Sequence, residues 1–146
     1  MAGVINDPCG PAAGRFLDIG CGTGILAQSL LARGSVTGVV GIDVNEPLLA
    51  RARAEITDAR ASFDLADAAA LPYASGSFEH ALSMLVWNFL EDRHASLREA
   101  MRVTRPGGTV SAAIWDMRGG FMYARFAWDI AAVLDPVAAA ERDKLF

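Results

Sequence analysis

The stretch that decides the fold of this chain is RFLDIGCGTG, at residues 15–24. Its first part is mostly apolar, and three glycines follow at alternate positions: Gly20, Gly22 and Gly24. Residues 25–31 then predict a helix. A strand, a glycine turn and a helix form the opening unit of nucleotide-binding α/β folds. Because glycine has no Cβ, the turn can be tight, and a ligand can lie against its backbone at the positive end of the helix.

Asp18, two residues before the first glycine, indicates the kind of ligand. A glycine turn alone is a weak signal, because ordinary tight turns also use glycine. The spacing here is Gly-x-Gly-x-Gly, whereas dinucleotide folds use Gly-x-Gly-x-x-Gly. A carboxylate at Asp18 would repel a pyrophosphate, but it can accept hydrogen bonds from an ammonium group, directly or through water. The combination favours a positively charged nucleoside without phosphates.

The composition is that of one globular domain with a sizeable core, since 53% of the 146 residues are hydrophobic and 21% are charged. The net charge of -4, without a block of Lys or Arg, argues against nucleic-acid binding. The longest apolar run, Ala81–Leu90, is too short to span a bilayer, and the N-terminus does not resemble a secretory signal. Cys9 and Cys21 suggest neither a disulfide framework nor a zinc site. We therefore expect a cytoplasmic protein without a metal.

A second carboxylate with the expected spacing is Asp43, about twenty residues beyond the glycine turn. It ends the near-continuous apolar run at residues 38–44, which predicts a buried parallel strand. A carboxylate at such a strand end can accept both hydroxyls of a ribose. A helix N-cap or a solvated strand end is the structural alternative.

The chain alternates between strand and helix patterns as far as residue 115. Strands are predicted at 16–19, 38–44, 61–66, 78–85 and 109–115, and helices at 25–33, 47–56 and 93–103. Thr23 is the expected N-cap of the first helix, the third strand is expected at a sheet edge, and residues 105–108 are expected to turn the chain. On the third helix we expect an inner face of Leu97, Ala100 and Met101 and a solvated face of Arg98, Glu99 and Arg102.

The two ends of the chain have different patterns. Residues 1–14 are rich in glycine and proline and are expected to be irregular. Near the C-terminus, a four-residue spacing predicts a helix that buries Met122, Phe126, Ile130 and Leu134 on one face. Asp135 is expected to cap a second short helix. Three nearby aromatic residues could line a substrate pocket or pack on the sheet: Phe121, Tyr123 and Trp128.

The stretch LDIGCGTG at 17–24 resembles the first signature of the class I S-adenosylmethionine-dependent methyltransferases, in particular the type 11-like small-molecule group. DAAALPY at 67–73 and RVTRPGGT at 102–109 resemble later stretches of the same family, in the right order. Glu79 stands where the family usually has Asp. The resemblance extends from Arg15 to about residue 116 and implies a Rossmann-like, doubly wound parallel α/β sheet. About five strands are implied, in the order 3-2-1-4-5, without the family's usual last two strands.

The resemblance also implies a cofactor, S-adenosyl-L-methionine, and a cofactor-binding domain over residues 15–146. Asp18, Gly20, Gly22 and Gly24 would hold its methionine portion, Asp43 its ribose, and Asp67, Val44 and Met84 its adenine, with Cys21 and Ala68 also at the cofactor. The implied activity is methyl transfer to a small-molecule acceptor by in-line displacement, in which the protein supplies alignment and removes water. The sequence identifies no general base and no other catalytic residue.

Two alternatives remain at this point. One is a truncated cofactor-binding module that is inactive alone or needs a partner, because the resemblance fails at both ends of the chain. The strand at 109–115 would then be an exposed sheet edge, and we expect a partner, a second copy or the final helix to cover it. The other alternative is an NAD-dependent oxidoreductase, which Asp18 and the glycine spacing disfavour.

Overall fold

The structure is a computed structural model that describes residues 13–116 and 122–145. The chain divides into two compact units, Met1–Ala113 and Ile114–Phe146. The extent of the cofactor-binding domain expected over residues 15–146 stays a prediction. Cys9 and Phe121 lie outside the described residues, whereas Cys21 is a free, buried cysteine.

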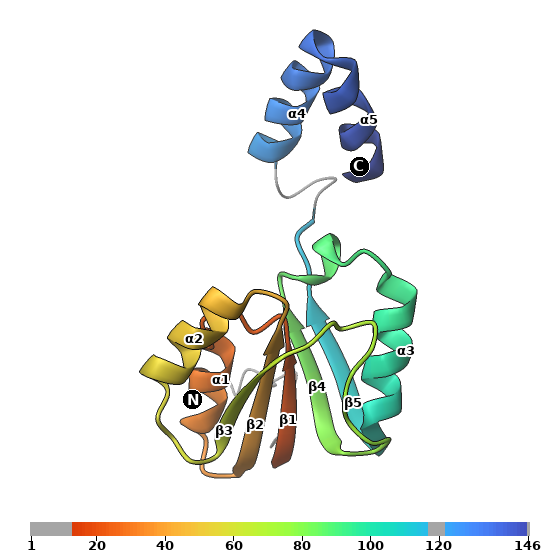
Figure 1. Cartoon of the computed structure of the whole chain (residues 1–146). Helices are drawn as coiled ribbons and strands as arrows, with labels where there is room; N and C mark the ends of the chain where they lie inside the picture. The colour runs from red at the N-terminus through yellow and green to blue at the C-terminus, as the bar shows by residue number, and fades with distance from the viewer. Residues whose placement is uncertain (1–12, 117–121, 146) are drawn as a thin grey trace, which may run out of the picture. The chain divides into compact units, whose positions relative to one another are not determined.

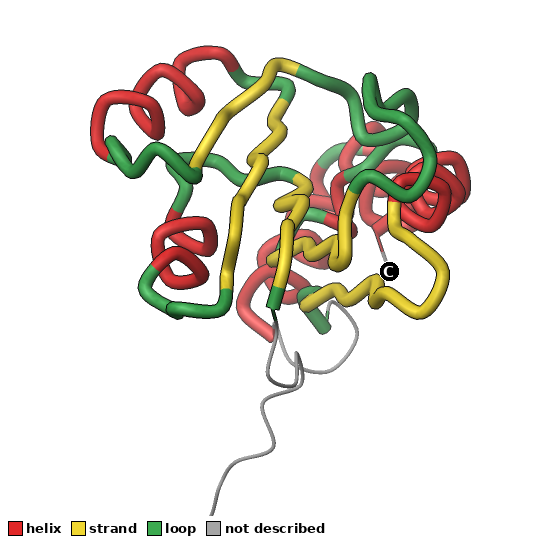
Figure 2. Tube along the Cα trace, turned by 90° about the horizontal axis from the view of Figure 1, so that it is seen from below, coloured by secondary structure: helices red, strands yellow, loops and turns green. Residues whose placement is uncertain are grey.

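The first unit is built on a five-stranded parallel sheet in the order β3-β2-β1-β4-β5, which confirms the predicted topology (Figure 1). Its strands are β1 (Gly14–Ile19), β2 (Val36–Asp43), β3 (Ala61–Leu65), β4 (Phe78–Met84) and β5 (Thr104–Ala113). Its helices are α1 (Ile25–Leu31), α2 (Glu46–Glu55), α3 (Arg93–Val103) and a short 3-10 helix, η1 (Trp87–Phe89). Seen from below, the strands lie side by side (Figure 2).

The alternation of side chains along β1 assigns one hydrophobic core to each face of the sheet. Phe16 packs with Leu30 of α1 and Leu49 of α2. The next residue, Leu17, packs in a second cluster with Ala100 of α3. Helices on both faces are what a parallel sheet requires, because its strands have two apolar sides.

Parallel pairing brings the carboxyl ends of the strands to one edge of the sheet. In the register, Ile19 lies opposite Ile42 of β2 and opposite Ser83 of β4, while Asp43 lies opposite Leu65 of β3. The turn after β1, the acid at the end of β2 and the loop after β3 therefore meet at the same edge. Ligands of open α/β sheets bind at this edge.

Two local predictions were wrong in detail. The N-cap of α1 is Gly24 rather than Thr23, and its φ of 85° is left-handed, which glycine adopts readily. Strand β5 begins at Thr104 rather than Thr109. The pairing with β4 is irregular between Phe78 and His80, which lie opposite Thr104 and Thr109. The expected turn at 105–108 is thus a bulge inside the strand.

The inner face of α3 also differs from the prediction. Its buried residues are Ser96, Ala100 and Val103, whereas Leu97 and Met101 are 42% and 61% exposed. Small residues form the stripe against the sheet, so the helix can approach closely and the larger apolar side chains project beside the contact. Among the polar residues expected on its solvated face, Glu99 and Arg102 are half-buried and bonded to a loop.

The second unit contains α4 (Met122–Leu134) and α5 (Pro136–Leu145). Oδ1 of Asp135 accepts a hydrogen bond of 2.8 Å from the backbone N–H of Val137, as the capping prediction requires. The burial expected for one face of α4 was wrong for Phe126, Ile130 and Leu134, which are exposed. Trp128 is half-buried, and the side chains of Met122 and Tyr123 lie outside the described part.

None of the helices in the described ranges has the length and hydrophobicity to cross a bilayer.

Candidate functional site

The glycine turn after β1 is fixed to the end of β2 by its backbone. The N–H groups of Gly20 and Cys21 both donate to the carbonyl oxygen of Ile42, at 2.8 and 2.9 Å. The N–H of Gly22 donates to Oδ2 of Asp43 at 2.9 Å. The turn and the acid therefore form one unit, with a geometry set by three hydrogen bonds.

Asp43 is held on both of its oxygens. Its Oδ1 accepts a hydrogen bond of 2.9 Å from the backbone N–H of Asn45, which itself caps α2. Each carboxylate oxygen has two lone pairs, so the half-buried group can still accept hydrogen bonds from a ligand. Asp43 thus connects the end of β2 to the glycine turn and to the start of α2, and its carboxylate can still accept hydrogen bonds from hydroxyl groups.

The three glycines of the turn have different environments. All have a positive φ, of 73° at Gly20, 54° at Gly22 and 85° at Gly24. A Cβ on Gly20 would lie 2.5 Å from Val86, and one on Gly24 would lie 2.5 Å from Ile56. A Cβ on Gly22 would meet nothing within 4 Å. Of the three glycines, Gly22 is therefore the one that borders open space rather than packed side chains.

Asp18 is buried at 1% exposure, and its Oδ2 has no hydrogen-bond partner among the described residues. Burial raises the pKa of this carboxyl to about 7, and the negative charge of Asp43 adds to the rise, while the backbone N–H of Ala27 opposes it. Buried polar atoms nearly always have a partner, because an unpaired one costs free energy. Among the described residues, this buried oxygen of Asp18 is therefore left without the hydrogen-bond partner that a buried carboxyl needs.

Two cavities lie along the carboxyl edge of the sheet and share Gly20. The larger, of about 300 Å³, is lined by Asp18, Gly20, Cys21, Gly22, Thr23, Ile25, Leu26, Leu48 and Met84. The smaller, of about 70 Å³, is lined by Ile19, Gly20, Ile42, Asp43, Val44, Ala66, Asp67, Ala68, Val86 and Leu90. All the predicted cofactor residues except Gly24 line one of these cavities. Gly24 is buried and starts α1.

The side chain of Cys21 belongs to the core. It is 8% exposed. Its Sγ packs against Gly41, where an added Cβ would lie only 2.7 Å from the sulfur. Burial raises the pKa of the thiol to about 12, with the charges of Asp18 and Asp43 adding to the effect. The thiol is therefore neutral at physiological pH, and Cys21 is not a nucleophile there.

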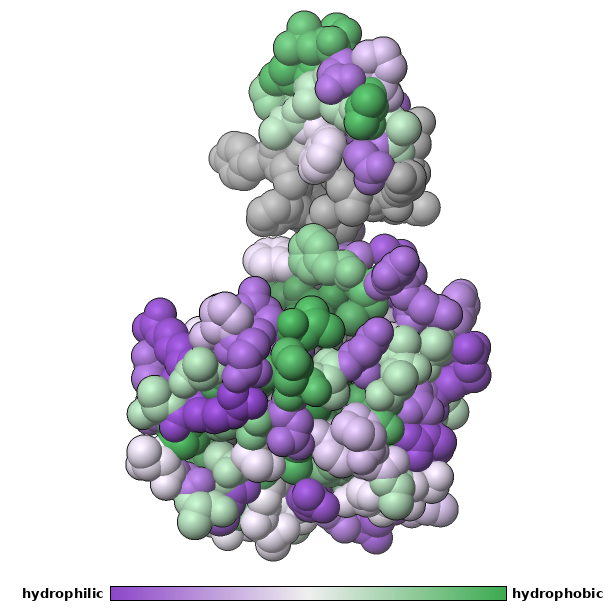
Figure 3. Space-filling view, viewed as in Figure 1, coloured by the Kyte–Doolittle hydropathy of each residue, from purple (hydrophilic) through white to green (hydrophobic). Residues whose placement is uncertain are grey.

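The residues expected around the adenine are divided between the two cavities. Asp67 is exposed, and its Oδ1 accepts a hydrogen bond of 2.8 Å from the N–H of Ala69. Val44 is 73% exposed beside it, whereas Met84, 41% exposed, lines the larger cavity with Asp18. The structure does not bring Met84 and Asp67 to the same cavity. Apolar surface forms a green strip between hydrophilic flanks on the viewed face of the first unit (Figure 3).

The segment after β4 begins with a residue in an unusual backbone conformation. Leu85 has a φ of 63°, which is a left-handed conformation. This conformation is energetically unfavourable for any residue that has a Cβ. The chain turns there, and Val86 comes to lie against Gly20 while Leu90 also lines the smaller cavity. The apolar run Ala81–Leu90 was visible in the sequence, but nothing in it marks Leu85 as strained.

Within the described ranges, no group of three or more His, Cys, Asp or Glu residues could hold a metal ion.

A family model described as "Methyltransferase domain" matches residues 17–112. The chain is 40% identical to methyltransferase GfsG of Streptomyces halstedii over 112 residues, 74% of this chain and 40% of that protein. It is 37% identical to the 27-O-demethylrifamycin SV methyltransferase of Amycolatopsis mediterranei over 105 residues, 68% of this chain and 38% of that protein. The chain thus spans about two fifths of the length of these curated relatives.

Solved structures give the same result. An S-adenosylmethionine-dependent methyltransferase from Mesorhizobium loti matches with a TM-score of 0.63 and 33% identity, over 67% of this chain and 45% of that chain. A chain of a complex that contains the Haloferax volcanii Trm112 methyltransferase activator matches with a TM-score of 0.66 and 29% identity, over 68% of this chain and 44% of that chain.

Proposed function

Because this chain belongs to the class I S-adenosylmethionine-dependent methyltransferases, we propose that it binds S-adenosyl-L-methionine along the carboxyl edge of its sheet and transfers the methyl group to a small molecule. The observation that carries this proposal is the buried Asp18, whose Oδ2 lacks a donor among the described residues and which lines a cavity of about 300 Å³. An ammonium group supplies both the hydrogen and the positive charge that this carboxyl needs.

The residues present fit the rest of that cofactor. Asp18 would hold the ammonium of the methionine portion, directly or through water, with the open space at Gly22 beside it. Asp43, already fixed by the N–H of Gly22, would accept the ribose hydroxyls. Asp67 would accept the exocyclic amino group of adenine, with Val44 against the ring.

When bound, the cofactor supplies a methyl group made electrophilic by its sulfonium. The chain's own contribution is to hold and orient the ligand, and to exclude water from it by the apolar surface of the cavity, including Ile25, Leu48 and Met84. The buried Asp18 also places negative charge close to the ligand's positive groups. We assign no general base.

The small-molecule acceptor is supported by charge and by a relative. The net charge of -4, without a block of Lys or Arg in the sequence, disfavours a nucleic-acid acceptor. One relative is named for the methylation of 27-O-demethylrifamycin SV, a small molecule. For the methyl acceptor of this chain, we propose only the class, a small molecule.

A second candidate is a cofactor-binding module that acts with a partner or a second copy on β5. It is supported by the position of β5 at the edge of the described sheet and by the structural neighbour in a complex with a methyltransferase activator.

The test is calorimetric titration of the purified chain with S-adenosylhomocysteine, the demethylated form of the cofactor. We expect micromolar binding, with no signal for NADH. Asp18→Asn should weaken binding at pH 8 by tenfold or more, about 1.4 kcal/mol. Glu55→Gln, on an exposed ion pair of α2, is the matched control and should bind as the wild type does. A folded wild-type chain that does not bind S-adenosylhomocysteine would contradict the proposal.

A further inference from the structure

The loop between β3 and β4, residues 66–77, carries part of the smaller cavity but contains neither helix nor strand. Its start is tied to β2, because the N–H of Ala66 donates to the carbonyl oxygen of Asp43 at 3.1 Å. Asp67 and Ala70 then form a turn, closed by a backbone hydrogen bond of 3.0 Å. These bonds, with the one from the N–H of Ala69 to Oδ1 of Asp67, fix the first part of the loop, and the rest of the loop is held by a second anchor.

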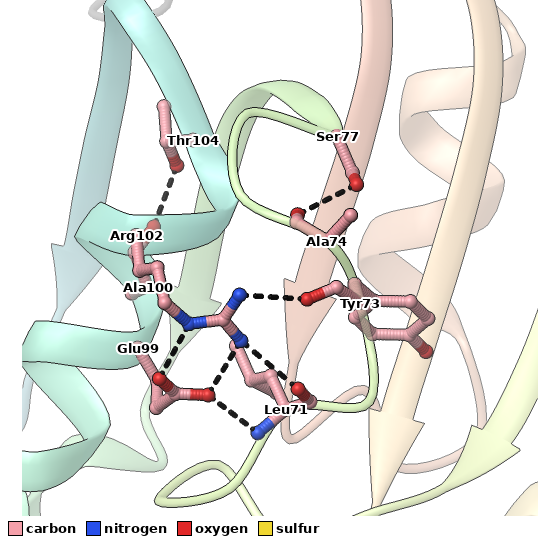
Figure 4. Close-up of polar contacts among 8 residues, drawn as sticks. All are labelled: Leu71, Tyr73, Ala74, Ser77, Glu99, Ala100, Arg102 and Thr104. Atoms are coloured by element: carbon pink, nitrogen blue, oxygen red, sulfur yellow. Dashed lines mark hydrogen bonds and ion pairs between the residues drawn. The ribbon is translucent and has the colours of Figure 1, made fainter.

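The next anchor comes from a pair of side chains on α3, Glu99 and Arg102 (Figure 4). Oε2 of Glu99 accepts a hydrogen bond of 2.8 Å from the N–H of Leu71. Arg102 donates from Nη2 to the carbonyl oxygen of Leu71 at 3.0 Å and from Nη1 to that of Tyr73 at 2.7 Å. The pair thus satisfies both backbone groups of Leu71, as a neighbouring strand would.

The pair is preorganised for this contact. Two bonds join its members: Nε of Arg102 donates to Oε1 of Glu99 at 2.7 Å, and Nη2 donates to Oε2 at 2.8 Å. Arg102 lowers the pKa of Glu99, with the N–H of Leu71 contributing to the same direction, so the acceptor stays ionised. A fork of this kind fixes geometry better than a single charge does.

The anchored segment has two further contacts, one with α3 and one with β3. The Leu71 side chain is 5% exposed and packs in the cluster that contains Ala100 and Val103 of α3. The hydroxyl of Tyr73 donates to Oδ2 of Asp64 on β3 at 2.7 Å. The loop is therefore fixed at two residues, and Asp67 lies between this anchor and the one at Ala66.

We propose that Glu99 and Arg102 are positioning residues for the adenine end of the cofactor site, because they hold the 66–77 loop in the place that presents Asp67 to the exocyclic amino group. The inference rests on the proposed function. It assigns to α3, which contributes no residue to either cavity, control over how strictly the site selects adenine.

The test compares two ligands, S-adenosylhomocysteine and S-inosylhomocysteine, in which a carbonyl replaces the amino group. The wild type should prefer the adenine form by about tenfold or more. Arg102→Met should reduce that preference to less than about threefold, mainly by weakening the adenine form. Arg102→Lys keeps the charge but not the fork, and it should give an intermediate preference if Arg102→Met does not fold.

The matched controls are Arg51→Met and Glu55→Gln, which break an exposed ion pair of 2.7 Å within α2. Both should keep the wild-type preference. Amide hydrogen exchange gives an independent readout, since the N–H of Leu71 should lose protection in Glu99→Ala and keep it in the controls.

Each result has a distinct meaning. If Arg102→Met and Arg102→Lys lower the affinity for both ligands equally, the preference for the adenine form is unchanged. Glu99 and Arg102 then have only a structural role, and the inference is overturned. If the wild type binds both ligands equally, the inference is overturned while cofactor binding stands. If the folded wild type binds neither ligand, the proposed function fails, and the inference fails with it.

Discussion

The backbone N–H of Gly22 donates a hydrogen bond of 2.9 Å to Oδ2 of Asp43. This bond joins the turn after β1 to the end of β2, across 21 positions of sequence. It makes the shape of the glycine turn depend on the acid that we propose for the ribose. We therefore expect ligand binding and local stability to be coupled at this pair.

Asp43→Ala should affect both properties. It removes the acceptors of Gly22 and Asn45, so we expect the free energy of unfolding to fall by about 1–3 kcal/mol. The affinity for S-adenosylhomocysteine should fall at least tenfold, or about 1.4 kcal/mol. Urea denaturation and calorimetry measure the two effects. Full stability together with wild-type affinity would show that the bond to Gly22 has no energetic role.

Gly22→Ala should separate ligand binding from packing. A Cβ there meets nothing within 4 Å, so the cost to the fold is that of a left-handed alanine, about 1–2 kcal/mol. The same Cβ enters the space proposed for the ligand, and we expect affinity to fall by about tenfold or more. Gly107→Ala is the matched control, because it also has a positive φ and open space around it but lines neither cavity. Equal affinities in the two variants would place the ligand elsewhere.

The raised pKa of Asp18 predicts how stability depends on pH without ligand. The carboxyl has a pKa of about 7 in the folded chain, against an ordinary value of 3.8 for aspartate, so the folded state holds its proton more tightly. The stabilisation is complete below pH 3.8 and is lost as pH rises through about 7. The difference in unfolding free energy between wild type and Asp18→Asn should change by up to about 4 kcal/mol across that window. A difference that is constant from pH 4 to pH 8 would refute this prediction.

Ligand binding should depend on the pH in the opposite direction. An ammonium ligand needs the ionised Asp18, which is the minor form at pH 6 when the pKa is about 7. Affinity for S-adenosylhomocysteine should therefore rise by about tenfold between pH 6 and pH 8. Calorimetry at pH 6, in two buffers of different ionisation enthalpy, should detect release of about one proton. Asp18→Asn should release none, and proton release by that variant would assign the effect to another group.

The topology could be predicted because its signals are local. Apolar runs that end at Ile19 and Asp43, with helical patterns between them, are sufficient for a parallel sheet with crossover helices. The same rule places strand-end residues at one edge of the sheet. The inner face of α3 could not be found in this way, because Leu97 is more hydrophobic than Ser96 and yet is the more exposed. Close packing selected the smaller residue.

The candidate site also has features that could be predicted from the sequence and features that could not. The sequence by itself determined the candidate residues Asp18, Gly22 and Asp43, because their chemical types and their spacing after two predicted strands can be read directly from it. Only the tertiary structure decided that Oδ2 of Asp18 has no partner within residues 13–116 and 122–145, and that Glu99 accepts a hydrogen bond from Leu71. Burial and hydrogen bonding of this kind depend on neighbours distant in sequence, because the loss of water around a group is set by the whole fold.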